Sequence, residues 1–135
     1  MVRTETVRRK CAKAAHRLDA AEQIFARPAN EFLADSAARD LASFYLFLAV
    51  QECIDVAIHW IADSGWAAPA DAGSTFDVLA GHGVIDQTLA DEMRGLVRVR
   101  NLIARGYDSI DPNQMQDQAK SWVDSLRRMI QACLR

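Results

Sequence analysis

Apolar residues recur at intervals of three and four along most of the chain, and this spacing restricts the possible folds more than any other feature. It puts apolar side chains on one face of an α-helix, whereas β-strands need alternation, which we do not find in the sequence. The stripe near the C-terminus is the clearest: Met115, Ala119, Trp122, Leu126, Met129 and Cys133. We therefore predict an all-α protein.

Two long helices are predicted in the first half of the chain. The first begins at Thr4 or Thr6, which can cap it, and ends before Pro28, because proline stops a helix. The second has its body at 39–63 and ends at Gly65. Its residues are apolar on nearly all sides, which is typical of a helix buried at the centre of a bundle.

The second half predicts one short helix and two more long ones. A loop at 67–73 precedes a short helix, capped by Ser74 or Thr75, that ends near Ala80. The two long helices have these predicted bounds: 87–106, capped by Asp86, and 112–133, with Asp111 as cap and Pro112 in the first position. Short connections favour antiparallel neighbours. We expect an up-and-down four-helix bundle with an additional short helix, in a single domain over residues 1–135.

Composition excludes several classes of function. The net charge of −2 gives no general attraction to nucleic acid, so any RNA contact requires a local basic patch. Three cysteines without a C-x-x-C pair predict inert buried thiols rather than disulfides or a metal site. The most apolar run, 41–50, is shorter than the roughly 20 residues of a membrane helix. The charged N-terminus lacks the apolar core of a signal peptide. We expect a cytoplasmic protein with no membrane contact.

A charged residue interrupts the apolar face of the helix predicted at 87–106. On a helical wheel one arc holds Arg100 among apolar residues, and the opposite arc is polar and basic. The basic arc is either a solvated face or a contact for RNA or a protein partner. The members of the two arcs are Leu89, Met93, Leu96, Arg100, Ile103 and Tyr107 on the first, and Arg94, Arg98, Asn101 and Arg105 on the second.

The guanidinium of Arg100 needs an anion or several acceptors if it faces the core, because it cannot lose its proton. Glu52, Asp55 and His59 share one face of the second helix. We therefore predict that Glu52 or Asp55 holds Arg100 in a polar pocket between the two helices. Two interpretations stay open here, namely a binding pocket and a buried ion pair that only fixes the register of the helices.

The run at 100–107, RNLIARGY, resembles the signature of HepT-like HEPN proteins. That signature reads Arg-Asn, three variable positions, His, any residue and Tyr. The segment at 76–86, FDVLAGHGVID, the pair Leu89-Ala90 and the run YDSID at 107–111 are also similar to the family. The order and length of the helices agree with the family across nearly the whole chain.

The resemblance implies a function and a set of site residues. Such proteins are four- or five-helix bundles that dimerise, and many are metal-independent endoribonuclease toxins that need no cofactor. A nucleotidyltransferase antitoxin of the MNT type neutralises them, in some members by transferring AMP groups to the motif tyrosine. By position, Arg100 would bind the scissile phosphate, Asn101 would orient it, and Tyr107 would be the residue that is modified.

One position departs from the family, because Arg105 stands where the signature has histidine. Arginine stays charged near neutral pH and cannot act as general base, whereas it can still bind phosphate. Three explanations compete. Arg105 is a substitution introduced to remove toxicity, or the chain is a natural member that binds without cleaving, or another histidine, His59 or His82, is the base.

Three readings of function follow. The first is an endoribonuclease toxin that is impaired in this sequence. The second is a non-catalytic helical module that binds RNA or the nucleotidyltransferase. The third is a helical bundle with a purely structural role. Apolar residues outside the predicted core stripes, namely Phe32, Leu33 and Trp66, either contribute to a homodimer or cap the bundle.

Overall fold

One long helix, α3, runs through the whole molecule, and the other helices pack around it. The computed structural model describes residues 4–106 and 110–135, and all its regular elements are helices. Their bounds are α1 (Thr4–Phe25), α2 (Ala29–Ala34), α3 (Ser36–Ser64), α4 (Ala72–Gly81), α5 (Gln87–Ala104) and α6 (Pro112–Cys133). The prediction of an all-α bundle is confirmed.

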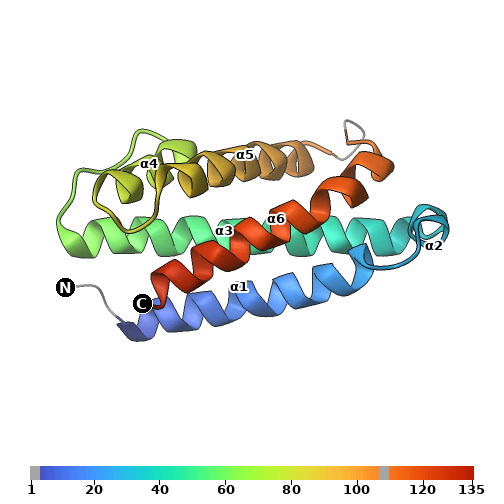
Figure 1. Ribbon diagram of the computed structural model, residues 1–135, viewed down its shortest axis with the longest axis horizontal. Coiled ribbons are helices and arrows are strands. Elements are labelled where there is room, and N and C mark those ends of the chain that lie inside the picture. The colour runs from blue at the N-terminus through green and yellow to red at the C-terminus, as the bar shows by residue number, and fades with distance from the viewer. Residues whose placement is uncertain (1–3, 107–109) are drawn as a thin grey trace.

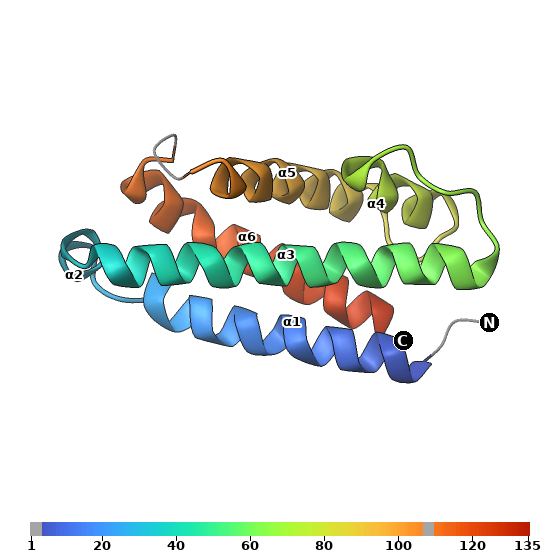
Figure 2. The same cartoon turned by 180° about the vertical axis from the view of Figure 1, so that it is seen from behind.

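The other helices lie along the two edges of α3 and across one of its faces. Figure 1 shows α4 and α5 along one edge of α3, α1 along the other, and α6 crossing obliquely between α5 and α1. The short helix α2 closes the end of the bundle between α1 and α3. Seen from behind, α3 lies in front, and in the described part of the chain no other helix covers it on that side (Figure 2).

Aspartate side chains cap the N-termini of four of the helices. Asp35, Asp71, Asp86 and Asp111 each accept a hydrogen bond from a backbone N–H in the first turn. The last two agree with the sequence analysis. The start of α4 was predicted wrongly, because Asp71 is the cap and Ser74 completes a reciprocal capping box with it.

Two further differences concern short or terminal segments. The helix α2 was not predicted, because six residues are too few to show a periodicity. Helix α5 ends at Ala104 rather than at 106, and Gly106 follows with a positive φ of 100°. Glycine reaches this backbone region without the steric cost that a Cβ atom brings.

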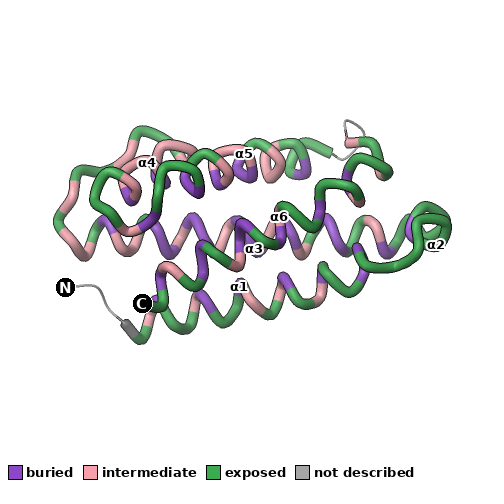
Figure 3. Tube along the Cα trace, in the orientation of Figure 1, coloured by how far each residue is buried: buried purple, intermediate pink, exposed green. Residues whose placement is uncertain are grey.

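The core lies along the inward faces of α1, α3, α5 and α6, as Figure 3 shows. Its largest fully buried side chains include Leu18, Phe32, Leu46, Phe76 and Leu126. The predicted stripe of α6 is buried, except that Trp122 is half-buried. The apolar side chains spaced by threes and fours along α1 are also buried, namely Val7, Cys11, Ala14, Leu18, Ala21 and Phe25. The apolar side chains predicted on the inward arc of α5, Leu89, Met93, Leu96 and Ile103, are also buried.

Helix α3 is apolar enough, by length and composition, to cross a membrane. Its most apolar stretch has a mean hydropathy of 1.6, and half of that stretch is buried inside the bundle. A core helix apolar on nearly all sides has the same character. The packing of the other five helices against α3 agrees with that role.

Candidate functional site

Arg100 lies in the last turns of α5 and is half-buried beside α3. Its Nε and Nη2 groups donate hydrogen bonds to Asn101 Oδ1, at 3.1 and 2.7 Å. Its Nη1 group donates to Gln51 Oε1 of α3, at 3.0 Å. The adjacent Arg-Asn pair therefore forms one unit, which Gln51 attaches to the central helix.

The partner of Arg100 on α3 was predicted wrongly. Gln51, rather than Glu52 or Asp55, contacts the guanidinium. Asp55 is one step removed, because its Oδ1 accepts from Gln51 Nε2 at 3.1 Å. Glu52 lies about 100° further around the helix than Gln51, and its buried Oε2 atom has no hydrogen-bond partner among the described residues.

The charge of Arg100 is oriented without being neutralised. Both direct partners are neutral amide side chains, and no ion pair of Arg100 is found in the described part of the chain. A guanidinium held by neutral acceptors remains free to take an anion as its counter-ion. The arrangement suits a phosphate better than it suits a pure register-fixing ion pair.

Arg105 is not brought to Arg100. It follows the last residue of α5, is exposed, and points about 140° away from Arg100 around the helix axis. Tyr107, the proposed modification site, lies outside the described residues. The relation of Tyr107 to the Arg100 cluster therefore stays a prediction.

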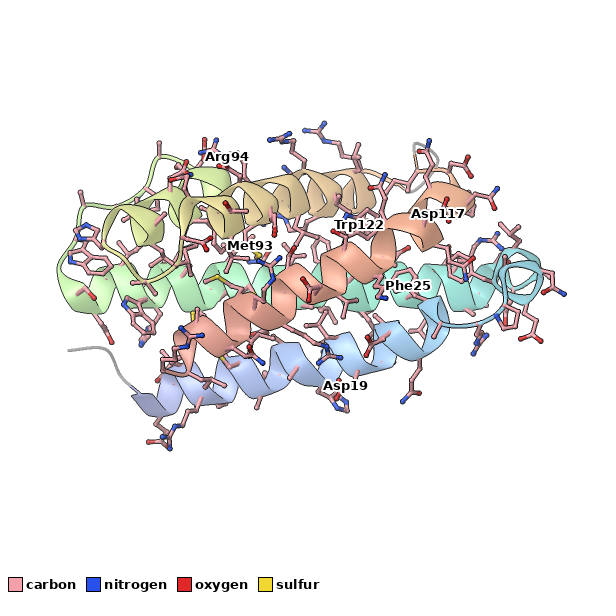
Figure 4. The ribbon with its side chains drawn as sticks, in the orientation of Figure 1. Asp19, Phe25, Met93, Arg94, Asp117 and Trp122 are labelled. Atoms are coloured by element: carbon pink, nitrogen blue, oxygen red, sulfur yellow. The ribbon has the colours of Figure 1, made fainter. Side chains whose placement is uncertain are left out.

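The outer face of α5 carries two free cations. Arg98 and Arg105 are exposed and have no ion-pair partner within residues 4–106 and 110–135. Arg94, a turn earlier, forms an ion pair with Asp77 of α4. Figure 4 shows Arg94 on the side of α5 that faces away from α3, whereas its neighbour Met93 points into the bundle. The basic face is thus only partly neutralised.

Neither histidine considered as a general base lies beside Arg100 within one chain. His59 Nε2 lies 3.1 Å from Asp63 Oδ2, two turns of α3 beyond Gln51, which is about 12 Å along the axis. His82 stacks on Trp66 with ring centroids 3.7 Å apart, in the turn after α4. Each histidine instead contacts a nearby side chain, Asp63 for His59 and Trp66 for His82.

The three cysteines converge, which the sequence did not indicate because they are far apart in it. Cys11, Cys53 and Cys133 come from α1, α3 and α6 and lie beside one another in the core. Burial raises the pKa of Cys11 to about 11 and that of Cys133 to about 12. Burial also raises the pKa of Cys53, with smaller contributions from the other two thiols. The prediction of buried thiols is confirmed.

The uncovered side of α3 carries apolar side chains at heptad spacing. Leu41, Phe44 and Ile58 are 44, 52 and 45% exposed, although they belong to the central helix. Leu48, Gln51 and Asp55 continue the same row and are half-buried. We call this row of six residues the α3 stripe. Because Gln51 also binds Arg100, the stripe borders the candidate site.

Two of the three residues that were predicted either to form a dimer surface or to cap the bundle pack within the bundle. Phe32 is fully buried in the core at the α2 end, and Trp66 is half-buried against His82. Their positions agree with the capping role. Leu33 remains 39% exposed.

The model of the family described as "Ribonuclease HepT-like" matches residues 14–133. This match spans most of the bundle and includes the Arg100 cluster. The chain belongs to the HepT-like family. The resemblance found in the sequence is thereby confirmed. No curated protein matches this HepT-like chain significantly.

Solved structures similar to this HepT-like chain come from toxin–antitoxin complexes. One, a toxin–antitoxin with AMP-PNP, has a TM-score of 0.88 at 19% identity, covering 95% of this chain and 96% of the other. Another is a tri-AMPylated Shewanella oneidensis HEPN toxin with its MNT antitoxin, with a TM-score of 0.87 at 20% identity, covering 94% and 95%. A third, a MntA–HpeT pair with a tyrosine-to-alanine substitution, has a TM-score of 0.84 at 19% identity, covering 94% and 96%. At these identities they establish a shared fold.

Proposed function

We propose that this chain is the toxin of an HEPN–MNT toxin–antitoxin system and that its site is built to cleave RNA. The oriented, uncompensated guanidinium of Arg100 is the observation that supports this most. Family membership and the fold shared with HEPN toxins agree with it. The protein would act in the cytoplasm, where cellular RNA and the antitoxin are made.

The proposed reaction is transesterification at a phosphodiester. The 2′-hydroxyl oxygen attacks the adjacent phosphorus and gives its proton to a base, while the 5′-oxygen leaves with a proton from an acid. Arg100 binds the phosphate oxygens and stabilises the charge that develops on them. Asn101 fixes the guanidinium through the two hydrogen bonds to its Oδ1. Arg100 supplies the positive charge that a metal ion supplies in other nucleases, so the reaction proposed here is metal-independent.

Activity of the chain as written would be impaired by Arg105. In the HepT-like signature this position holds the histidine that exchanges protons with the substrate. The guanidinium of arginine stays protonated, so Arg105 can bind a phosphate but cannot act as base. His59 lies about 12 Å along α3 from Gln51, and His82 lies before the start of α5, whereas Arg100 lies near its end. Replacement of the base within the same chain is therefore disfavoured.

A homodimer along the α3 stripe would complete the site. Large apolar side chains on an uncovered helix face mark an interaction surface. Self-pairing of the stripe would place the two Arg100 clusters on one interface, because Gln51 belongs to both the stripe and the cluster. A scissile phosphate could then contact side chains from the α5 helices of both subunits.

The proposed regulator is a nucleotidyltransferase of the MNT type. Solved complexes of similar fold pair an HEPN toxin with an MNT antitoxin, and one toxin is AMPylated. Tyr107 is the motif tyrosine that would accept AMP groups here. Bulky, negatively charged groups beside Arg100 would repel an RNA phosphate and silence the site.

A second candidate function is binding without cleavage. Arg105 favours it, because this residue keeps a phosphate contact while removing the base. In that case the chain would bind RNA or the nucleotidyltransferase as a helical module. Both candidates use Arg100, and they differ only in whether a proton-transfer group is present.

Expression in a bacterial host without the antitoxin separates the two candidates. We expect the chain as written to be tolerated, the Arg105→His variant to arrest growth, and Arg105→His with Arg100→Gln to be tolerated again. Equal amounts of soluble protein, measured by immunoblot, are the control. A soluble Arg105→His variant without effect on growth or on cellular RNA would overturn the nuclease and leave the binding module.

A further inference from the structure

A pocket of 130 Å³ opens between the end of α5 and the start of α6. Val99 and Leu102 form its α5 wall, while Gln114, Gln118 and Trp122 line it from α6. The three α6 residues are spaced by four and therefore form one row along that helix. The function proposed above does not use this pocket.

The pocket lies across α5 from the Arg100 cluster. Around the helix axis, Arg100 faces α3, Val99 faces α6, and Leu102 lies on the outside about 160° from Arg100. In the other direction around the axis, the angle from Arg100 is about 100° for Asn101, 140° for Arg105 and 160° for Arg98. A band of polar and basic side chains thus leads from Arg100 over the outer face of α5 to the pocket.

The charge along this band fits a polyanion. Arg98 and Arg105 are exposed and unpaired within the described ranges, in a protein whose net charge is −2. Two neighbouring cations without a compensating carboxylate create a local positive potential that attracts an anion. Half the circumference of a helix with its side chains is roughly 15–19 Å. A single RNA strand of a few nucleotides spans that distance.

The chemistry of the pocket fits a nucleobase. It offers an indole ring, aliphatic side chains and two exposed primary amides. Aromatic rings stack on unpaired bases, and glutamine amides donate to and accept from their polar edges. A carbohydrate would need more polar contacts, and a purely apolar ligand would leave the two amides without a role.

Resting on the function proposed above, we propose that this pocket holds one unpaired base of a single-stranded RNA. The backbone of this RNA crosses α5 over Arg105 and Arg98 and presents a phosphate to Arg100. In this protein Arg105, which stands where the signature has histidine, then binds the RNA backbone. The pocket would give the site a preference for the identity of a base a few nucleotides from the bound phosphate.

Tryptophan fluorescence tests the pocket in the 135-residue chain with Arg105 in place, where cleavage is expected to be impaired. Trp60→Phe with Trp66→Phe leaves Trp122 as the only tryptophan. We expect an octaribonucleotide of mixed sequence to quench Trp122 on saturation, and a dinucleotide, too short to reach it, to leave it unchanged. An octanucleotide bound through Arg100 that leaves Trp122 fluorescence unchanged would overturn the proposal.

Surface variants give an independent readout by fluorescence anisotropy of the labelled octanucleotide. Leu102→Glu should lower affinity at least about fivefold, the lower limit of what one stacked base contributes. Gln118→Ala should reduce the preference among homopolymeric octanucleotides. The matched controls, Leu134→Glu and Gln131→Ala, change exposed residues of the same types far from the pocket and should have no effect. Affinity should fall with salt with a logarithmic slope of about −2, as expected for three phosphate contacts on a single strand.

The outcomes separate this inference from the function on which it rests. If Arg100→Gln abolishes RNA binding while Leu102→Glu and Gln118→Ala do not alter it, the base pocket is wrong and the RNA site stands. If these two variants weaken binding of the purified nucleotidyltransferase and not of RNA, the pocket is a protein interface and the proposal fails. Absence of RNA binding by every form, with no cleavage by Arg105→His, would overturn both.

Discussion

At the scale of single residues, the site depends on how Arg100 is held. A half-buried guanidinium needs acceptors, and here they are the amide oxygens of Asn101 and Gln51. Neutral acceptors satisfy its N–H groups while leaving its charge available. The inward position of Arg100 could be predicted from the sequence, because it follows from the period of one helix.

The identity of its partner could not be predicted in the same way. Which residue of α3 meets Arg100 depends on the axial register of two helices, and neighbouring residues such as Gln51 and Glu52 point about 100° apart. The i, i+4 spacing of Gln51 and Asp55 was the available signal, because such a pair shares one face. The carboxylates Glu52 and Asp55 were favoured because they can neutralise a guanidinium, which the amide of Gln51 cannot.

Replacing Gln51 by leucine tests the orienting contact. Leucine keeps a similar volume and removes the oxygen that accepts from Arg100 Nη1, so we expect the free energy of unfolding to fall by about 1–2 kcal/mol. RNA affinity should fall as well, because Arg100 becomes free to adopt other rotamers. Urea denaturation and RNA titration measure the two effects.

Gln131→Leu is the control for that experiment, because Gln131 is exposed on α6. It should change neither quantity. A Gln51→Leu variant that binds RNA as tightly as the original chain would show that Arg100 needs no support from α3.

The thiols provide a prediction about alkaline pH. Folded-state pKa values of Cys11 and Cys133 are raised to about 11 and about 12 from 9.0, so these thiols stabilise the fold fully below pH 9. As pH rises above 9, the unfolded chain ionises first and this stability is lost until the folded thiols ionise too. For Cys133 the slope is about 1.4 kcal/mol per pH unit between pH 9 and 11.

Comparison with Cys133→Ala isolates that contribution. Both proteins are unfolded by urea at several pH values, and the original chain should lose stability more steeply than the variant above pH 9. Parallel curves for the two proteins would mean that Cys133 ionises as readily in the folded state as in the unfolded one.

At the scale of elements, caps and periodicity accounted for most of the helices. The Asp86 and Asp111-Pro112 starts follow from local chemistry, and so could be predicted. Helix α2 and the Asp71 start of α4 could not, because a six-residue segment and a loop with several polar residues offer more than one solution. The convergence of the three cysteines belongs to tertiary packing, which no local pattern encodes.

The cap of α5 matters because this helix carries the site. Asp86 Oδ1 accepts from Leu89 N at 2.8 Å. Asp86→Ala should lower the free energy of unfolding by about 1 kcal/mol, whereas Asp86→Asn, which retains a capping oxygen, should change it little. Thermal or urea unfolding followed by circular dichroism measures both. Equal stability of the two variants would show that the cap is dispensable.

At the scale of the whole molecule, the uncovered side of α3 is the least expected feature. A central helix is normally covered on all sides, yet the α3 stripe leaves Leu41, Phe44 and Ile58 about half exposed. The apolar character of α3 was read from the sequence, but which of its sides lacks a neighbour depends on where α6 crosses. A second copy of the chain would cover this side.

Phe44→Glu tests the dimer. A carboxylate within a self-paired apolar row would be buried in the interface without a partner, so we expect a monomer by light scattering. Leu134→Glu changes a side chain of similar exposure outside the stripe and should leave a dimer. A single-chain mass for the original protein, or a dimer that persists in Phe44→Glu, would exclude this interface.

Cleavage of RNA by purified protein tests the central claim most directly, namely that Arg100 binds the scissile phosphate and that only the group at position 105 prevents cleavage. Single-stranded RNA is incubated in EDTA with the chain as written, with Arg105→His, and with Arg105→His combined with Arg100→Gln. We predict cleavage by Arg105→His alone, about 10²–10⁴-fold faster than by the chain as written. Equal rates for all three proteins, or cleavage by Arg105→His that does not need Arg100, would contradict it.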